Sequence, residues 1–464
     1  MISSNYLLVL PIVAALFLMV SAATIRWGLL LVVGLLFLLA EGFTSFLIVL
    51  ALAGVAWTGA NLLCKPGFKS PRWLAVLIVL EVLPLLFYKL LKAGLSEAFG
   101  GALPEGASDH WLPPLGLSVM TFQAVSYTVD RYREELPSNS WLHYGIYMGF
   151  FPHLAAGPIL KASDFIKQLV ASRRVDVQDL QQGLWRIFSG LFKKLVLSDV
   201  IAKAGINPVF SDPTSFSSVE ILVALLAYTF QIYLDFSAYS DVVIGSARLL
   251  GFRLPENFDR PYHAPSIAEY WRRWHMSLSA WVGHYVYRPL GGNRVVTWKI
   301  YRNVLVSIVL LAVWHGVTFN FLLYGLIHGT AVCLNRWVRL KDGWVQFKQR
   351  HPHMSLIACW GLTFAFVVFA RILFKTPTLQ DAWLFCDALL HSELSGSPRF
   401  SLVFWLCFLG GVLAYCSPLR LQASVQAFFV RQAAAVQGLM FALVLFLGAF
   451  LSGGEALQFI YRQF

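Results

Sequence analysis

Apolar segments long enough to cross a bilayer recur along the whole of this 464-residue chain. A helix needs about 20 apolar residues to span the hydrocarbon core. Hydrophobic residues make up 58% of the chain and charged residues 13%, whereas a soluble domain carries about 25% charged residues. Most of the surface must therefore face lipid, where only helices and closed barrels satisfy the backbone. We predict an all-α polytopic membrane protein with roughly 10–12 transmembrane or re-entrant helices, forming a single membrane domain over residues 1–464.

The borders of the expected spans are set by polar or basic stretches between the apolar runs. The spans lie near residues 5–23, 27–57 (as one helix or two short ones), 72–92, 112–129, 141–160, 183–206, 219–250, 300–318, 320–338, 355–374, 400–416 and 436–452. The first run is expected to stay as a helix and not to be removed as a signal peptide, because no basic region precedes it and further apolar runs follow directly. The six cysteines contain no CxxC pair, so we interpret them as small buried residues and not as a disulfide framework or a metal cluster.

The net charge of +12 comes from basic stretches between the apolar runs, and no basic domain or tail accounts for it. Basic loops fix the orientation of membrane proteins by the positive-inside rule. The charge therefore predicts topology and not a nucleic-acid partner. We expect residues 65–72, 161–194 and 253–302 to face the cytoplasm.

The segment 265–289 lies in the last of these basic regions and is too polar to span the bilayer. Its bulky apolar residues recur at helical spacing, while Arg272, Arg273 and Ser277 fall largely between them. This pattern predicts an amphipathic helix that lies at the membrane interface or dips into the protein.

Two apolar segments carry polar or ionisable side chains, which at membrane depth usually face a partner or a cavity. Gln123 and Asp130 lie in the first, where polar side chains either join neighbouring helices by hydrogen bonds or contact a ligand directly. Asp235, Tyr239 and Asp241 lie in the second. The two aspartates are six residues apart and do not share a helical face, so a carboxylate dyad is not expected. Each is either structural, paired with Arg248 or another basic group, or part of the wall of a site.

A third segment, "LLAVWHGVTFNFLLYGLIHGTAV", places His315 well inside an apolar run, between Trp314 and Gly316. A second histidine, His328, follows thirteen residues later. A histidine in such a place is either a hydrogen-bonded core residue or a catalytic group, and we favour catalysis more for His315 than for His328. The segment has no HExxH pattern and no spacing typical of metal ligands, so no metal site is expected.

Several long stretches, in this order along the chain, resemble the membrane-bound O-acyltransferase (MBOAT) family, and more narrowly its bacterial exopolysaccharide branch, the membrane subunits of alginate and cellulose acetylation. They cover residues 112–133, 150–165, 183–199, 228–252, 258–294 and 301–329, followed by "QFIYRQF" at 458–464. The most distinctive are "EYWRRWH" and "VWHG". The resemblance covers nearly the whole chain.

The resemblance implies a ring of tilted helices around a thin centre, with funnels open to both membrane faces. The catalytic histidine of the family falls on His315, and the histidine of "RRWH" falls on His275, in a segment that lines the cytoplasmic funnel. Arg272 and Arg273 either contact anionic parts of an acyl donor or anchor the helix at lipid headgroups. The predicted catalytic residues are His315 and His275. The predicted substrate-binding residues are Trp314, Asn320, Arg272, Arg273, Trp274, Gln123, Asp235 and Tyr239.

The expected function is acetyl transfer from a cytoplasmic donor for O-acetylation of an exported polysaccharide, in the bacterial inner membrane. His315 is expected to act as a general base on an acceptor hydroxyl or as a nucleophile, because the pKa of an imidazole lies near working pH. The donor is expected to be acetyl-CoA or another acyl thioester, with no bound cofactor. The expected partners are a periplasmic acetyltransferase and a polysaccharide synthesis and export complex.

Two alternatives remain open from the sequence. The first is D-alanyl transfer to teichoic acid by the same fold. The second is a transporter without chemistry. Many transporters are built from repeated halves with broken helices, and the sequence shows no such repeat.

Overall fold

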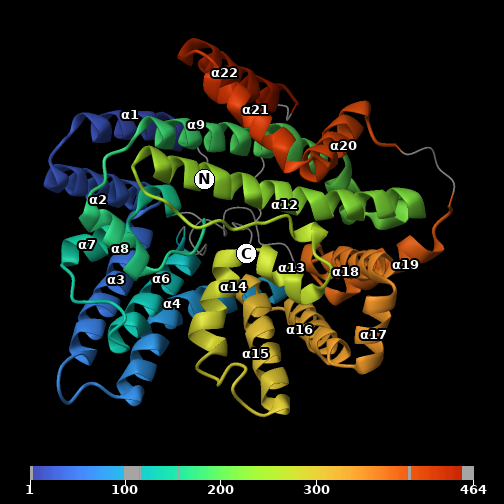
Figure 1. Cartoon of the computed structure of the whole chain (residues 1–464), viewed down its shortest axis with the longest axis horizontal. Helices are drawn as coiled ribbons and strands as arrows, with labels where there is room; N and C mark the ends of the chain where they lie inside the picture. The colour runs from blue at the N-terminus through green and yellow to red at the C-terminus, as the bar shows by residue number, and fades with distance from the viewer. Residues whose placement is uncertain (1–3, 99–113, 115, 155–156, 395–398, 452–464) are drawn as a thin grey trace. The chain divides into compact units, whose positions relative to one another are not determined.

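The computed structural model describes residues 4–98, 114, 116–154, 157–394 and 399–451 (Figure 1). Within these residues the regular elements are helices, and the bridge between Phe258 and Trp274 is an isolated antiparallel pair. The C-terminal "QFIYRQF", residues 112, 113 and 115 of the 112–133 stretch, and residues 155 and 156 of the 150–165 stretch lie outside the described residues.

The chain forms two compact units. Unit 1 contains Met1–Ile187 and Val243–Pro255, and unit 2 contains Phe188–Val242 and Glu256–Phe464. The chain passes from unit 2 to unit 1 within one long helix, α12 (Ser218–Leu249). The prediction of a single membrane domain over residues 1–464 stays a prediction, since the division into two compact units does not test it.

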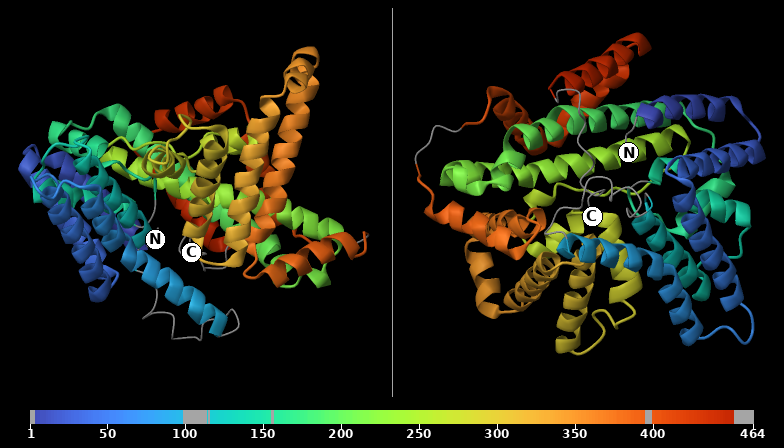
Figure 2. Two further views of the ribbon diagram at one scale, coloured as in Figure 1. Left: turned by 90° about the horizontal axis from the view of Figure 1, so that it is seen from below. Right: turned by 180° about the vertical axis from the view of Figure 1, so that it is seen from behind.

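Unit 1 is built from antiparallel helices around a helix rich in polar side chains. Its elements are α1 (Ser4–Met19), α2 (Ala23–Ala40), α3 (Phe43–Leu63), α4 (Pro71–Ala98), α6 (Leu117–Tyr132), α7 (Trp141–Met148), the 3₁₀ turn η1 (Phe151–His153), α8 (Ala162–Ala171) and most of α9 (Val177–Leu191). Helix α6 lies beside α3 and α4 (Figures 1 and 2). The Thr128 hydroxyl on α6 donates a hydrogen bond to the Glu81 carboxyl on α4. Thr128 thus joins α6 to α4, which agrees with one of the two interpretations of this segment, whereas the Thr121 hydroxyl donates to its own helix, at the Leu117 carbonyl.

Unit 2 begins with irregular helix. Its elements are the π-helix η2 (Phe192–Ser198), α10 (Asp199–Ile201), the π-helix η3 (Ala202–Ile206), α11 (Asn207–Ser211), η4 (Pro213–Ser215), most of α12, η5 (Pro261–His263), α13 (Ile267–Arg273), α14 (Met276–Val282), the π-helix η6 (Gly283–Tyr287), α15 (Thr297–His315), α16 (Phe319–Arg339), α17 (Asp342–Arg350), α18 (Pro352–Lys375), α19 (Leu379–His391), α20 (Leu402–Cys416), α21 (Leu419–Arg431) and α22 (Ala434–Leu451). Helices α15 and α16 form a hairpin (Figures 1 and 2). The Thr318 side chain caps α16 by accepting a hydrogen bond from the Phe321 N–H.

Seven helices among the described residues are long and apolar enough to span a membrane, or eight if the bent pair α20–α21 is one span. The seven are α2, α3, the first 21 residues of α4, α12, α15, α18 and α22. The protein is therefore a multi-pass membrane protein. In α12, 78% of the apolar window is buried, compared with 11% in α22. Helix α12 thus packs mainly against protein, which explains how it carries polar residues.

Five of the expected spans, near residues 5–23, 112–129, 141–160, 183–206 and 320–338, are not among the membrane-spanning helices found in the described residues. Residues 27–57 form the two helices α2 and α3, which is one of the two predicted possibilities. Residues 141–160 do not form a span, so that prediction is wrong. Helix α7 ends at Met148, because the Gly149 N–H already closes the last turn on the Gly145 carbonyl and Pro152 follows in a 3₁₀ turn. A proline within the next turn has no N–H with which to continue an α-helix.

Two glycines of unit 1, Gly183 on α9 and Gly245 on α12, bring two backbones into direct contact. A Cβ at Gly245 would lie 2.6 Å from the Gly183 carbonyl oxygen, and a Cβ at Gly183 would lie 2.9 Å from the Gly245 oxygen. Small residues allow this close approach in membrane proteins, where packing takes over from the hydrophobic effect.

Gly245→Ala is expected to destabilise the protein by about 1–3 kcal/mol, the usual range for overpacking, because the atom that blocks the new methyl group is backbone. Thermal unfolding of the purified protein in detergent measures this. Gly54→Ala in α3 is the matched control, since its Cβ would meet nothing within 4 Å, and alanine has the higher helix propensity. Equal melting temperatures for the two variants would contradict the close packing.

Candidate active site

His315 is the last residue of α15 and lies in an aromatic pocket of side chains in unit 2. Only 4% of it is exposed. Its ring centroid lies 4.7 Å from that of Trp314, 5.1 Å from that of Phe374 and 5.9 Å from that of Phe321, which it stacks on. These contacts come from the end of α18 and the start of α16, so two helix ends fix the orientation of the imidazole.

His275 lies where the predicted amphipathic helix of residues 265–289 is interrupted. The structure has two short helices, α13 and α14, separated by Trp274 and His275. His275 has a φ of 45°, in the left-handed region, which is strained for a residue with a side chain. The single helix is therefore a wrong prediction.

The interruption has a physical reason in the residues that precede α13. The Met276 N–H donates to the Asn257 carbonyl at 2.9 Å, and the Asp259 N–H donates to the Arg273 carbonyl at 3.1 Å. These backbone groups are satisfied by another part of the chain, and so they are not available to a continuous helix. The break turns His275 into the interior, where 3% of it is exposed.

Trp314 lies between the two predicted catalytic histidines. Its ring centroid is 6.2 Å from that of His275 and 4.7 Å from that of His315. Phe236 of α12 packs edge-on against His275 at 4.7 Å. The structure therefore brings the buried His275 and His315 together with the partly buried Trp314, and we call these three residues the histidine cluster.

Burial lowers the pKa of His275 from its ordinary value to about 3. The ring is then neutral at pH 7, with one nitrogen as a donor and the other as an acceptor. A pKa this far below working pH makes His275 a weak base. His275 therefore suits hydrogen bonding to a reacting group better than removal of its proton.

Asn320 and Trp274 lie next to the histidine cluster. The Asn320 Nδ2 donates to the Thr376 carbonyl at 2.7 Å, and this bond ties the start of α16 to the end of α18. Trp274 stacks on Tyr270 with 5.8 Å between ring centroids. Both side chains are buried, and their predicted substrate contacts stay predictions.

The two adjacent arginines of the "EYWRRWH" stretch lie away from this buried group. Arg272 and Arg273 both pair with Glu269, at 3.2 and 3.0 Å. The Arg272 side chain is 71% exposed. This position fits either of the predicted roles, a headgroup anchor or a contact for an anionic part of a donor, and neither role follows from the geometry.

The acidic residues of α12 form separate ion pairs. Asp235 lies 2.7 Å from the Lys194 ammonium, and Asp241 lies 2.6 Å from that of Lys193. The expected absence of a dyad agrees with this arrangement, and the partners are lysines. Of the two predicted kinds of partner, Arg248 or another basic group, the structure shows the second, and Arg248 pairs with Asp179. Tyr239, on the same helix, is buried, and its predicted role stays untested.

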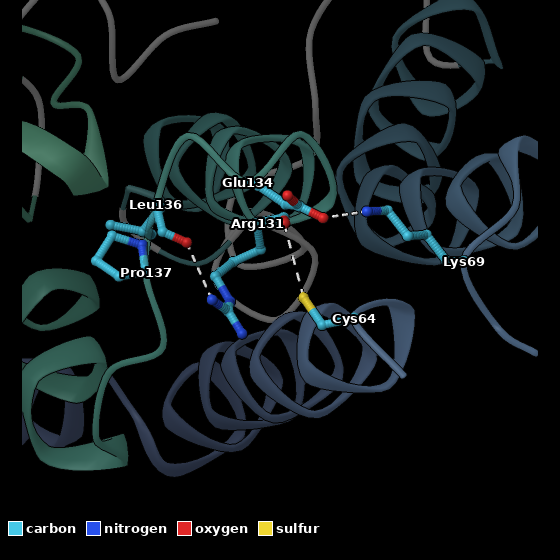
Figure 3. Close-up of a pocket in the computed structure, with 6 residues that line it drawn as sticks. All are labelled: Cys64, Lys69, Arg131, Glu134, Leu136 and Pro137. Atoms are coloured by element: carbon cyan, nitrogen blue, oxygen red, sulfur yellow. Dashed lines mark hydrogen bonds and ion pairs between the residues drawn. The ribbon is translucent and has the colours of Figure 1, made fainter. Parts of the chain in front are cut away.

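Gln123 belongs to unit 1. Its side-chain amide nitrogen, Nε2, donates to the Tyr147 carbonyl at 3.2 Å, and 1% of the residue is exposed. This bond agrees with the helix-joining interpretation of Gln123. A pocket of about 240 Å³ also lies in unit 1 (Figure 3). It contains none of the predicted site residues and is lined by Cys64, Lys69, Arg131, Glu134, Leu136 and Pro137.

Sequence reasoning missed Arg371 of α18, which is 1% exposed and packs on Trp274. The signal was available, because Arg371 is a charged residue near the C-terminal end of an apolar helix of 24 residues.

Residues 73–374 match the sequence profile of MBOAT, the membrane-bound O-acyltransferase family. The chain belongs to this family. The matched region contains His275, His315 and Arg371 and covers more than half of the chain. The family resemblance predicted from the motifs is thereby confirmed.

The names of three relatives refer to three different polymers, namely alginate, peptidoglycan and teichoic acid. A probable alginate O-acetylase, AlgI, of Pseudomonas aeruginosa is 33% identical over 328 residues, covering 69% of this chain and 60% of that protein. A peptidoglycan O-acetyltransferase of Helicobacter pylori is 33% identical, covering 68% of this chain and 64% of that protein. A teichoic acid D-alanyltransferase of Bacillus subtilis is 28% identical, covering 64% and 76%. The match thus spans less than two thirds of the length of the first two relatives.

Proposed function

We propose that this MBOAT protein transfers an acetyl group from a cytoplasmic thioester, acetyl-CoA or another acyl thioester, for O-acetylation of an exported polysaccharide. The observation that carries the proposal is the histidine cluster, in which two buried imidazoles share one aromatic neighbour. The alginate and peptidoglycan relatives support acetyl as the group and a polysaccharide as its destination.

The residues of the histidine cluster suggest how the transfer proceeds. An acceptor hydroxyl oxygen attacks the carbonyl carbon of the thioester, and His315 takes the hydroxyl proton. The C–O bond forms, the C–S bond breaks, and the departing thiolate takes the proton from His315. The products are an acetyl ester and a free thiol, and His315 is neutral again. Trp314 and Phe321 hold the ring in place and exclude water that would hydrolyse the thioester.

A hydrated polymer is a poor substrate for a buried aromatic site, because its hydroxyls would have to leave water. We therefore propose a relay in which the acetyl group passes to a periplasmic acetyltransferase that modifies the polymer as part of a synthesis and export complex. The periplasmic acetyltransferase is expected to co-purify with the protein in mild detergent. A purified protein that modifies polymer alone would contradict the relay.

D-alanyl transfer is the alternative that a specific observation favours, namely the similarity to the Bacillus subtilis protein. Mild alkaline hydrolysis of the cell-envelope polymers distinguishes the two functions, because it releases acetate from acetyl esters and D-alanine from D-alanyl esters. Deletion of the gene is expected to lower ester-bound acetate and to leave D-alanine unchanged, and the wild-type gene is expected to restore it. A loss of D-alanine with unchanged acetate would reverse the assignment.

A further inference from the structure

Arg371 of α18 is a buried cation without a carboxylate partner in the part of the chain that the structure describes. It is 1% exposed, and the ion pairs found among the described residues involve other cations. Its Nη2 donates to the Tyr270 hydroxyl at 2.7 Å. Its Nε–H is buried and has no hydrogen-bond partner among these residues. A charged group with an unused donor is expensive to bury.

Aromatic rings form the surroundings of this guanidinium. Its central carbon lies 4.4 Å from the ring centroid of Trp274 and 5.4 Å from that of Phe374. Aromatic faces attract a cation, but this attraction only partly replaces the hydration that an arginine loses on burial. Ionisable groups that membrane proteins keep at such positions usually meet an ion or a substrate.

One of these two rings contacts a histidine directly, and the other belongs to the residue that precedes the second histidine. Trp274 directly precedes His275 in the chain, and Phe374 packs against His315 with 5.1 Å between ring centroids. The positive charge therefore lies one aromatic ring away from the His315 imidazole of the histidine cluster. Negative charge that develops at the cluster is favoured by this fixed cation.

We propose that Arg371 binds the acyl carbonyl oxygen of the donor and stabilises the negative charge that this oxygen gains during transfer. This inference rests on the proposed function. The oxygen becomes negative when the hydroxyl attacks the carbonyl carbon, and it returns to a carbonyl when the C–S bond breaks. A single buried N–H suits a single oxygen atom, whereas a phosphate presents several hydrated oxygens and is better held by a bidentate, accessible group. In this mechanism Arg371 binds the acyl carbonyl oxygen, and His315 takes the proton of the acceptor hydroxyl.

The test compares Arg371→Met and Arg371→Lys with the wild type in inside-out membrane vesicles from cells that make the polymer. Incorporation of radiolabelled acetyl from acetyl-CoA gives kcat and KM per amount of protein. Free CoA, which lacks the acyl carbonyl, serves as a competitive inhibitor that reports binding of the rest of the donor. We expect Arg371→Met to lower kcat about 10²–10³-fold, as removal of an oxyanion donor does, with KM and the inhibition constant of CoA changed less than about threefold. Arg371→Lys is expected to restore part of kcat.

Stability provides a readout that separates this role from a structural one. Met is close to Arg in length and removes an unpaired buried charge, so Arg371→Met is expected to melt at the wild-type temperature or above it. Lys375→Met, one helical turn further along α18, is the control and is expected to keep kcat within about threefold.

Two outcomes would overturn the proposal. One is wild-type kcat in Arg371→Met. The other is weaker inhibition by CoA with kcat unchanged, which would assign Arg371 to a phosphate of the donor. Failure of the proposed function is distinguishable from both, because the wild-type vesicles themselves would then incorporate no acetyl.

Discussion

Replacing His315 by alanine is expected to lower polymer O-acetylation about 10²–10⁴-fold, the usual contribution of a general acid–base group. The physical reason is that the variant lacks the imidazole that takes the proton of the acceptor hydroxyl in the proposed mechanism. A nucleophilic role for His315 predicts a loss at least as large. The measurement is ester-bound acetate in polymer from cells that carry the variant, with the amount of protein in the membrane determined in parallel.

His391→Ala is the matched control for this experiment. His391 is an exposed histidine at the end of α19, and its Nδ1 lies 2.9 Å from an Asp387 carboxylate oxygen. Its removal changes the histidine content and the surface charge but leaves the interior intact, so acetate is expected to stay at the wild-type level. Full acetylation by His315→Ala at normal protein level would show that His315 is a core residue, and it would reopen the transporter alternative.

The membrane class and the position of the main helices could be predicted from the sequence because they depend on one simple quantity, the length of apolar runs. Helices α2, α3, α12, α15 and α18 lie within a few residues of the predicted spans. The prediction failed at residues 141–160, because it relied on the apolar composition of this stretch and did not consider the helix end at Gly149 and Pro152. A hydropathy window averages over such residues, whereas a helix ends at a single one.

The break at His275 shows that the spacing of apolar residues does not predict where long-range hydrogen bonds interrupt a helix. Residues 265–289 have a helical pattern throughout, and their side chains are indeed buried on one face, including Trp271, Leu278 and Trp281. The interruption is made by long-range backbone bonds from Asn257 and Asp259, which no local pattern encodes. Sequence similarity to the family pointed to His275 itself, and the structure adds the geometry that brings it to Trp314.

Partners of buried charges were the least predictable feature. Lys194 stood at the end of a stretch that we expected to be a basic cytoplasmic region, yet it is buried in the π-helix η2. Two aspartates surround its ammonium group at 2.7 Å each, Asp199 from the neighbouring α10 and Asp235 from α12. From composition alone, Lys194 is one of the basic residues that predict topology. The fold shows that it is the shared cation partner of two buried carboxylates.

Lys194→Met is therefore expected to destabilise the protein by about 3–5 kcal/mol, the usual result of removing one partner from a buried ion pair. Burial opposes the charge of Lys194, but the two carboxylates outweigh this effect and raise its pKa. The ammonium therefore stays charged, and its loss would leave two carboxylates close together in the interior. The measurement is the thermal unfolding of the purified variant in detergent, together with its yield as a monodisperse species.

Lys193→Met provides the control, because it removes the same group from the adjacent position. The pair that Lys193 forms with Asp241 reaches the surface, with 21% and 13% of the two side chains exposed, so Asp241 can regain part of its hydration. We expect a loss of about 1 kcal/mol or less, as for other accessible pairs. A variant that combines Lys194→Met with Asp199→Asn and Asp235→Asn is expected to recover much of the stability, because no buried charge then lacks a partner. If Lys194→Met and Lys193→Met melted at the same temperature, the charge balance around Lys194 would not be what holds η2, α10 and α12 together, and packing alone would have to account for their contact.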